Sequence, residues 1–377
     1  MRQRIIFLTE VNSHFTRLAH FPDLWKELDL NFPFQPTLNP LSNFLSRYTP
    51  ARSIESLSFP STTRKHEFLK FLVTLKRLRS HLAFIHLSGR EVTGTVLTAV
   101  KSLLGTWTDT IILECPSPKV DVGHIAPLIA ASPRLKTFAL QTGTRFAGME
   151  YTGFLKTLVR AGETSRLHHR HPEINARLRT LQLSTLIPQT VKFSVLADLG
   201  RFFPLLEMLR IENWKIEVDG GEKVAPIMTL RGLALVGIDV VDKKSNSPFA
   251  DLLLKYLREL TQLEILMLGA RDIDVLGWKL FVRKPEMGRL FGRLHFANLK
   301  FLWLRGWIVN CVDLLSLKAP RLKWLVLEEC KGINGGWIKA VRGHWRDIVV
   351  VESDTRLKDG IDLFTWKKRA KHGIESA

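Results

Sequence analysis

The chain has 377 residues, of which 45% are hydrophobic, and a formal net charge of +19. No apolar run is long enough to cross a bilayer, so we expect no membrane partner. The three cysteines are odd in number and far apart, which argues against a disulfide framework and favours a reducing cytoplasmic or nuclear setting. The basic residues are spread along the chain, and this indicates diffuse surface charge in preference to a dedicated nucleic-acid site.

The first predicted element is an amphipathic segment near the N-terminus. Val11, Phe15 and Leu18 recur at helical spacing, and Leu24 and Trp25 follow them. Apolar residues three to four positions apart gather on one face of a helix. We assign residues 1–30 to a helical cap, because the end of a repeat array needs a cover over its apolar core.

Between residues 31 and 352 one apolar phrase, L-x-x-L-x-L, recurs, mostly at intervals of roughly 23 to 36 residues. The interval from Leu135 to Leu178 is longer, about one and a half periods, and the frame between Leu87 and Leu135 is ambiguous. This phrase is the strand signature of a leucine-rich repeat. Its second and third apolar residues alternate with other residues, so both face the core from a short strand. The copies are Ile54–Phe59, Leu82–Leu87, Leu135–Leu140, Leu178–Leu183, Leu206–Ile211, Leu230–Leu235, Leu263–Leu268, Leu299–Leu304 and Leu322–Leu327.

Apolar residues at helical spacing follow several of these strands, for example over 68–75 and 252–257. Repeated strand-then-helix units predict an α/β solenoid, a horseshoe with parallel strands on the concave face and helices on the convex face. The frame is ambiguous at 111–113, and a last edge strand is predicted over 347–351. Cys330 lies at the turn position of its repeat, where its side chain can satisfy backbone groups.

Candidate binding residues are those between the buried leucines, because alternate residues of a strand point to opposite faces of the sheet. In the C-terminal repeats these residues are large, whereas the equivalent positions over 137–141 and 180–184 are small or polar. An exposed aromatic and apolar patch is typical of an interaction site. The predicted partner-binding residues are Ile265, Met267, Phe301, Trp303, Arg305, Trp324, Val326 and Glu328. The alternative is that these side chains pack on each other or lie under the C-terminal tail.

Residues 353–377 form a basic C-terminal tail with lysines beside Phe364 and Trp366. Basic residues next to aromatics can contact nucleic acid. Lysine-rich chain ends are more often solvated, and we favour that interpretation here.

Residues 11–25 resemble the second half of an F-box. In that family V-C-x-x-W-x-x-L-A leads into L-W-x-x-L-x-L, and Val11, Phe15, Leu18, Leu24 and Trp25 fall on these positions, with Phe15 in place of the usual tryptophan. The L-P-x-E opening of the family motif is not matched, so either the F-box is truncated or the chain has lost ligase coupling. Together with the repeats, this segment makes the chain similar to F-box/leucine-rich-repeat proteins.

This resemblance implies a protein-recognition module that acts as the substrate receptor of an SCF-type ubiquitin ligase. Its partners would be the SCF adaptor subunit, bound by the five F-box-like residues, the cullin complex and a protein substrate. One alternative is a stand-alone leucine-rich-repeat scaffold without ligase coupling, and another is a basic nucleic-acid-associated protein. The phosphate-loop, serine-elbow and H-E-x-x-H motifs do not occur. From these missing motifs we expect no catalytic residues, no metal and no cofactor. We also expect a monomer.

Overall fold

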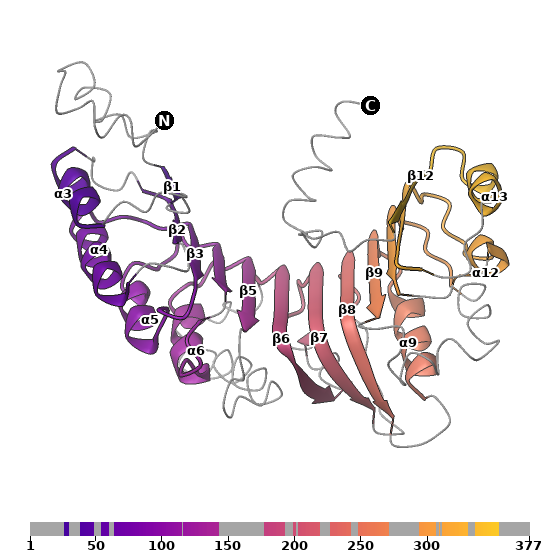
Figure 1. The fold of residues 1–377 in the computed structure, drawn as a ribbon, viewed down its shortest axis with the longest axis horizontal. Coiled ribbons are helices and arrows are strands. Elements are labelled where there is room, and N and C mark those ends of the chain that lie inside the picture. Colours follow the sequence, from indigo (N-terminus) through magenta and orange to yellow (C-terminus); the bar gives the residue numbers. More distant parts are fainter. Residues whose placement is uncertain are drawn as a thin grey trace, which may run out of the picture.

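The computed structural model forms one open, curved sheet with helices along its outer side (Figure 1). It describes residues 26–29, 38–48, 54–59, 64–114, 116–142, 177–192, 199–200, 203–218, 227–242, 248–270, 294–306, 309, 311–330 and 336–353. The F-box-like residues of the predicted cap, and all but the first residue of the predicted tail, lie outside these ranges.

The sheet has 12 strands that follow one another in chain order, from β1 at one edge to β12 at the other. Every neighbouring pair is parallel. The strands are β1 (Glu27–Asp29), β2 (Ser56–Phe59), β3 (Phe84–Ser88), β4 (Thr110–Glu114), β5 (Thr137–Thr142), β6 (Thr180–Lys192), β7 (Met208–Val218), β8 (Gly232–Asp242), β9 (Ile265–Ala270), β10 (Phe301–Arg305), β11 (Trp324–Glu328) and β12 (Val349–Ser353). The predicted leucine-rich-repeat type of solenoid is therefore present.

Helices follow strands on both arms of the arc. In Figure 1, α3 to α6 lie outside the N-terminal arm, and α12 and α13 lie outside the C-terminal arm. The helices are α3 (Leu38–Tyr48), α4 (Lys65–Arg77), α5 (Gly94–Lys101), α6 (Val122–Ala130), α9 (Pro248–Glu259), α12 (Cys311–Leu315) and α13 (Trp337–His344). Within the described part of the chain, none of them is both long and apolar enough to cross a membrane.

Helix α4 shows how the sequence sets the packing of one repeat. Phe68, Phe71, Leu72 and Leu75 are buried, and their spacing places them on one face of the helix. Helix α6 begins with a capping box, in which Asp121 accepts a hydrogen bond from the backbone N–H of His124 at 3.1 Å. Such caps satisfy backbone groups that the first turn leaves unpaired.

The main core is a set of aligned rows between sheet and helices. The second leucine of each repeat pairs in register with its neighbours, and this row is 0–1% exposed. The row consists of Leu57, Ile85, Ile111, Phe138, Leu181, Leu209, Leu233, Leu266, Leu302 and Leu325. Full burial of one such side chain contributes about 1.5–3 kcal/mol. The ambiguous frame at 111–113 is settled by this row, since Ile111 belongs to it.

The backbone repeats one connection at the entrance to each strand. The carbonyl of Lys136 accepts two hydrogen bonds, from the N–H groups of Arg179 and Thr180 at 2.8 and 2.9 Å. Equivalent residues do the same in the neighbouring repeats, for example Glu207 and Glu264. A proline occupies the turn that precedes β7: the N–H of Leu206 donates to the carbonyl of Phe203 at 3.0 Å, with Pro204 between them. Proline suits this turn because its fixed φ matches the second turn position.

The middle strands β6 to β8 are longer than the short strands expected from the phrase. The β6–β7 register shifts between Ser184 and Gln189, around Pro188, which has no N–H to donate. In β7 and β8, Asn213 and Gly237 have φ values of 60° and 62° in strands paired side by side, so both strands bend at the same level. Each strand continues as a second paired segment beyond the bend.

Candidate functional site

The inner face of the sheet carries the residues between the buried leucines. In the C-terminal repeats it holds a second group of buried apolar side chains, separate from the main core. We call this group the apolar cluster; it comprises Met208, Ala234, Val236, Ile265, Met267, Phe301, Trp303 and Val326. It runs across neighbouring strands from β7 to β11. Ala234, Met267, Trp303 and Val326 form one row of register pairs, and Ile265 pairs with Phe301.

The structure brings the eight predicted partner-binding residues together on β9, β10 and β11. Five of them, Ile265, Met267, Phe301, Trp303 and Val326, belong to the apolar cluster. Their side chains are 2–9% exposed, so they contribute packing within the face. Glu328 is also buried, Arg305 is half-buried, and Trp324 is exposed at 39%. Partner binding by these residues stays a prediction.

A polar boundary closes the cluster at the C-terminal ends of β10 and β11. Trp303 Nε1 donates a hydrogen bond to Glu328 Oε2 at 3.2 Å. Arg305 Nε lies 3.5 Å from Glu328 Oε1 and donates to Glu329 Oε2 at 3.1 Å. The buried carboxylate therefore accepts a hydrogen bond on one oxygen and has a guanidinium beside the other, and such pairing offsets the cost of burying the charge.

Three apolar side chains extend the cluster to the solvent. Trp324, Val349 and Val351 are 39%, 42% and 37% exposed. Trp324 pairs in register with Val349, and Val326 of the cluster pairs with Val351, so the three side chains share the inner face of β11 and β12. We call them the edge patch. An exposed tryptophan beside branched apolar residues, continuous with a buried apolar surface, is a typical anchor for a protein partner.

Towards the N-terminus the same face becomes polar. Arg210 is 8% exposed and its Nη2 donates to Glu212 Oε2 at 3.0 Å. The sequence predicts small and polar residues on this face over 137–141 and 180–184. Arg210, which that prediction did not include, lies on the same face because it pairs in register with Gln182.

A hydroxyl, an imidazole and a carboxylate line up across β2, β3 and β4. Ser58 Oγ is 3.2 Å from His86 Nδ1, and His86 Nε2 is 3.1 Å from Glu114 Oε2. The hydrogen bond from His86 lowers the pKa of Glu114 below its ordinary value of 4.5, and it outweighs burial, which acts in the opposite direction. These groups present hydrogen-bond donors and acceptors to the concave space. The sequence could have indicated them, because each of the three residues is next to a buried apolar residue of its strand, at a position that faces the concave side.

Cys330 behaves as its place in the repeat predicts. Its Sγ lies 3.4 Å from the carbonyl of Leu304 and 3.5 Å from that of Glu328, at the turn that leaves β11. The preceding Glu329 has a positive φ of 53°, like Gly306 at the same position one repeat earlier. Among the described residues no group of three or more His, Cys, Asp or Glu side chains could hold a metal ion.

The five F-box-like residues lie outside the described residues, so their contacts are not placed. No family model matches the chain, and no curated protein sequence matches it. Among solved structures, the chain is similar to the one described as the crystal structure of the Rad7 and Elc1 complex in yeast. That match has a TM-score of 0.48 and 11% identity, and it covers 98% of this chain and 88% of that chain.

Proposed function

We propose that this chain is a protein-recognition module that binds a partner protein on the concave face at its C-terminal end. The observation that carries the proposal is the edge patch, in which Trp324, Val349 and Val351 are exposed beside a buried apolar cluster. A rigid parallel sheet positions these side chains, so a partner would lose little free energy to ordering the surface. We expect the chain to act by binding and not by catalysis.

The finer proposal is that the bound partner is a substrate for ubiquitin transfer. It is supported by the F-box-like residues Val11, Phe15, Leu18, Leu24 and Trp25, which match the part of that motif that leads into leucine-rich repeats. In this proposal the N-terminal segment binds the SCF adaptor subunit and its cullin complex, while the concave face holds the substrate.

The experiment is affinity purification of the tagged full chain from eukaryotic lysate with quantitative mass spectrometry. Trp324→Ala is expected to reduce recovery of the concave-face partner, with a loss in affinity of about 30-fold, or roughly 2 kcal/mol, for a central tryptophan anchor. Val73→Ser is the matched control, because Val73 is 51% exposed on α4, outside the concave face. Equal recovery of the partner by wild type and Trp324→Ala would refute partner binding at the edge patch.

A second variant tests ligase coupling separately. Leu24→Ala with Trp25→Ala is expected to abolish recovery of adaptor and cullin while the concave-face partner is retained. If adaptor and cullin are absent from the wild-type sample, the chain is a stand-alone scaffold and the finer proposal fails.

A further inference from the structure

A pocket opens between the last repeats, at the edge of the sheet where the strands begin. Its volume is about 820 Å³, and its wall includes Leu317, Pro320 and Leu322 together with the indole of Trp345. The residues come from His295 before β10, from the continuous stretch 315–323 between the end of α12 and β11, and from the turn that joins α13 to β12. The pocket is therefore built from three separate parts of the chain.

Hydrogen bonds fix the walls of this pocket. Trp345 Nε1 donates to the carbonyl of Ala319 at 2.8 Å, and the indole is 5% exposed. On the opposite side the N–H of Phe296 donates to the carbonyl of Lys318 at 2.9 Å, within a parallel bridge that joins His295 and Lys318. The pocket is preformed, so a ligand would not have to order it.

The charges around the pocket are unbalanced. Lys318, Arg321, Lys323 and Arg346 line it, and Asp347 is the one acidic residue in the lining. Arg321 Nη1 donates to a neutral group, Asn298 Oδ1, at 3.0 Å. Among the residues that the structure describes, none of the four cations forms an ion pair with a carboxylate. We call this site the basic pocket.

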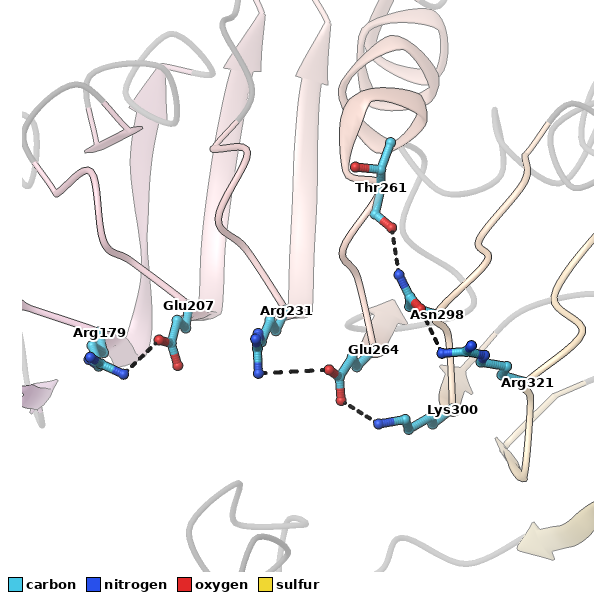
Figure 2. A network of polar contacts seen from close by, with 8 residues as sticks. All are labelled: Arg179, Glu207, Arg231, Thr261, Glu264, Asn298, Lys300 and Arg321. Carbon is cyan, nitrogen blue, oxygen red and sulfur yellow. Dashed lines mark hydrogen bonds and ion pairs between the residues drawn. The ribbon is translucent and has the colours of Figure 1, made fainter.

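Along the same edge of the sheet, outside the pocket, the charged side chains form ion pairs. The residue before each strand is often charged, and these charges pair across neighbouring repeats (Figure 2). Arg179 Nη1 lies 2.9 Å from Glu207 Oε1, and Glu264 lies 4.0 Å from Arg231 and 2.9 Å from Lys300. Figure 2 also shows a separate group of contacts beside this row, in which Asn298 donates to the carbonyl of Thr261 and accepts a hydrogen bond from Arg321. The pairing thus stops where the basic pocket begins.

The sign of the remaining charge suits an anion. The four cations and Asp347 leave a formal charge of +3. The C-terminal ends of α12 and α13 also lie at this region, since Leu315 and His344 line the pocket, and helix C-termini add partial negative charge. The formal charge of the side chains still favours an anion, and a phosphomonoester carries about −1.5 to −2 at neutral pH.

The surroundings favour a peptide over a nucleic acid. A nucleic acid is held by a continuous track of cations along its backbone. Here the neighbouring cations Arg179, Arg231 and Lys300 on this edge of the described sheet lie beside carboxylates, so an unpaired row of cations does not continue from the pocket along that edge. Lys323 of the pocket is followed directly by Trp324 of the edge patch, so a cation that can bind an anion and an apolar anchor are adjacent at the start of β11.

We propose that the basic pocket binds a phosphorylated side chain, phosphoserine or phosphothreonine, in the partner whose apolar residues contact the edge patch. This inference rests on the proposed function, which it narrows to phosphorylated protein segments. Arginine and lysine clusters recognise such groups through charge-assisted hydrogen bonds.

The test uses the folded full chain and a fluorescent peptide library with one fixed phosphoserine, compared with the same library carrying serine. We expect the phosphoserine library to bind at least about tenfold more tightly, and Arg321→Gln with Arg346→Gln to remove that preference. The matched control is Arg179→Gln with Arg231→Gln. These two cations belong to the row of ion pairs outside the pocket, their side chains are 55% and 56% exposed, and the double variant should keep the preference. Circular dichroism and thermal unfolding verify that both double variants are folded.

Three results would overturn the inference: equal binding of the two libraries, equal loss of preference in the control variant, or displacement of bound phosphopeptide by single-stranded RNA at lower concentration than by unlabelled phosphopeptide. Failure here is distinct from failure of the proposed function. If phosphatase treatment of the lysate leaves recovery of the Trp324-dependent partner unchanged, the concave-face proposal stands and the phosphate proposal falls. If phosphopeptides bind to the basic pocket but Trp324→Ala leaves partner recovery unchanged, the edge-patch proposal falls, and with it the inference that one partner contacts both surfaces.

Discussion

At the scale of single residues, the neighbours of each side chain on the concave face determine whether it is buried or exposed. Trp303 and Trp324 occupy the same face on neighbouring strands, yet one is 4% exposed and the other 39%. Trp303 has cluster members on both sides and donates its N–H to Glu328, whereas Trp324 pairs with the exposed Val349. The first residue thus serves stability and the second is free to serve binding.

This division predicts different effects of two matched substitutions. Trp303→Phe removes the donor to Glu328 and leaves part of a carboxylate that is 3% exposed without its hydrogen bond. An unsatisfied buried polar group costs about 1–3 kcal/mol, so the free energy of unfolding in urea should fall by that amount. Trp324→Phe, at an exposed position, should change it by less than about 0.5 kcal/mol. Equal losses in the two variants would contradict the assignment.

A second prediction at this scale concerns acid. The pKa of Glu114 is lowered by its hydrogen bond from His86, so the folded state favours the carboxylate. The resulting stability is present above the ordinary value of 4.5 and is lost as pH falls through the lower pKa of the folded state. The effect is small, because the Glu114 side chain is 40% exposed and screened by water.

His86→Asn should move the pKa of Glu114 back towards 4.5, followed by NMR titration of the side-chain carboxyl. It should also flatten the loss of stability below that pH, and Glu114→Gln should flatten it equally. An unchanged Glu114 titration in His86→Asn would show that the contact does not set the pKa.

At the scale of elements, the repeat phrase predicted the strands well because its physical cause is local. Alternating apolar residues must face one core, and each predicted copy from Ile54 to Leu327 contributes a strand in register with the next. The predicted edge strand over 347–351 lies at Val349–Ser353. A turn closed by the N–H of Ile348 on the carbonyl of Trp345 precedes it.

What the phrase could not predict depends on neighbours in space. The burial of Phe301 and Trp303 follows from the residues on β9 and β11, and periodicity within one strand carries no information about them. The basic pocket likewise joins His295 to Arg346 across two repeats of irregular length. The length of β7 and β8 depends on paired bends at Asn213 and Gly237, which no apolar pattern encodes.

These bends give a prediction for one glycine. Gly237 has a φ of 62°, and a Cβ added there would collide with Asn213 Oδ1 on the neighbouring strand. Left-handed backbone costs a non-glycine residue about 1–2 kcal/mol before any clash, so Gly237→Ala should lower the free energy of unfolding by at least that amount. Gly343→Ala is the control, because nothing lies within 4 Å of its added Cβ in α13. There a stabilisation of about 0.5–1 kcal/mol is expected, and destabilisation of both variants would argue against the bend.

At the scale of the whole molecule, the order of the sheet makes the structure quasi-one-dimensional. Each strand pairs only with the strands before and after it in the sequence, from β1 to β12. In such an array stability is close to a sum of repeat terms and nearest-neighbour terms. The C-terminal end that carries the edge patch and the distant N-terminal end are then energetically separable, which a single globular core would not allow.

Hydrogen exchange followed by mass spectrometry tests this separation. Leu325 of β11 and Leu57 of β2 are both 0% exposed in the same row of the core. Truncation of a buried leucine to alanine costs about 2–5 kcal/mol. Leu325→Ala should therefore speed exchange in β10 to β12 and leave β2 to β5 protected, and Leu57→Ala should do the opposite. If either variant loses protection evenly from β2 to β12, the solenoid unfolds as one unit. A partner bound at the edge patch would then stabilise the distant end of the molecule as strongly as its own.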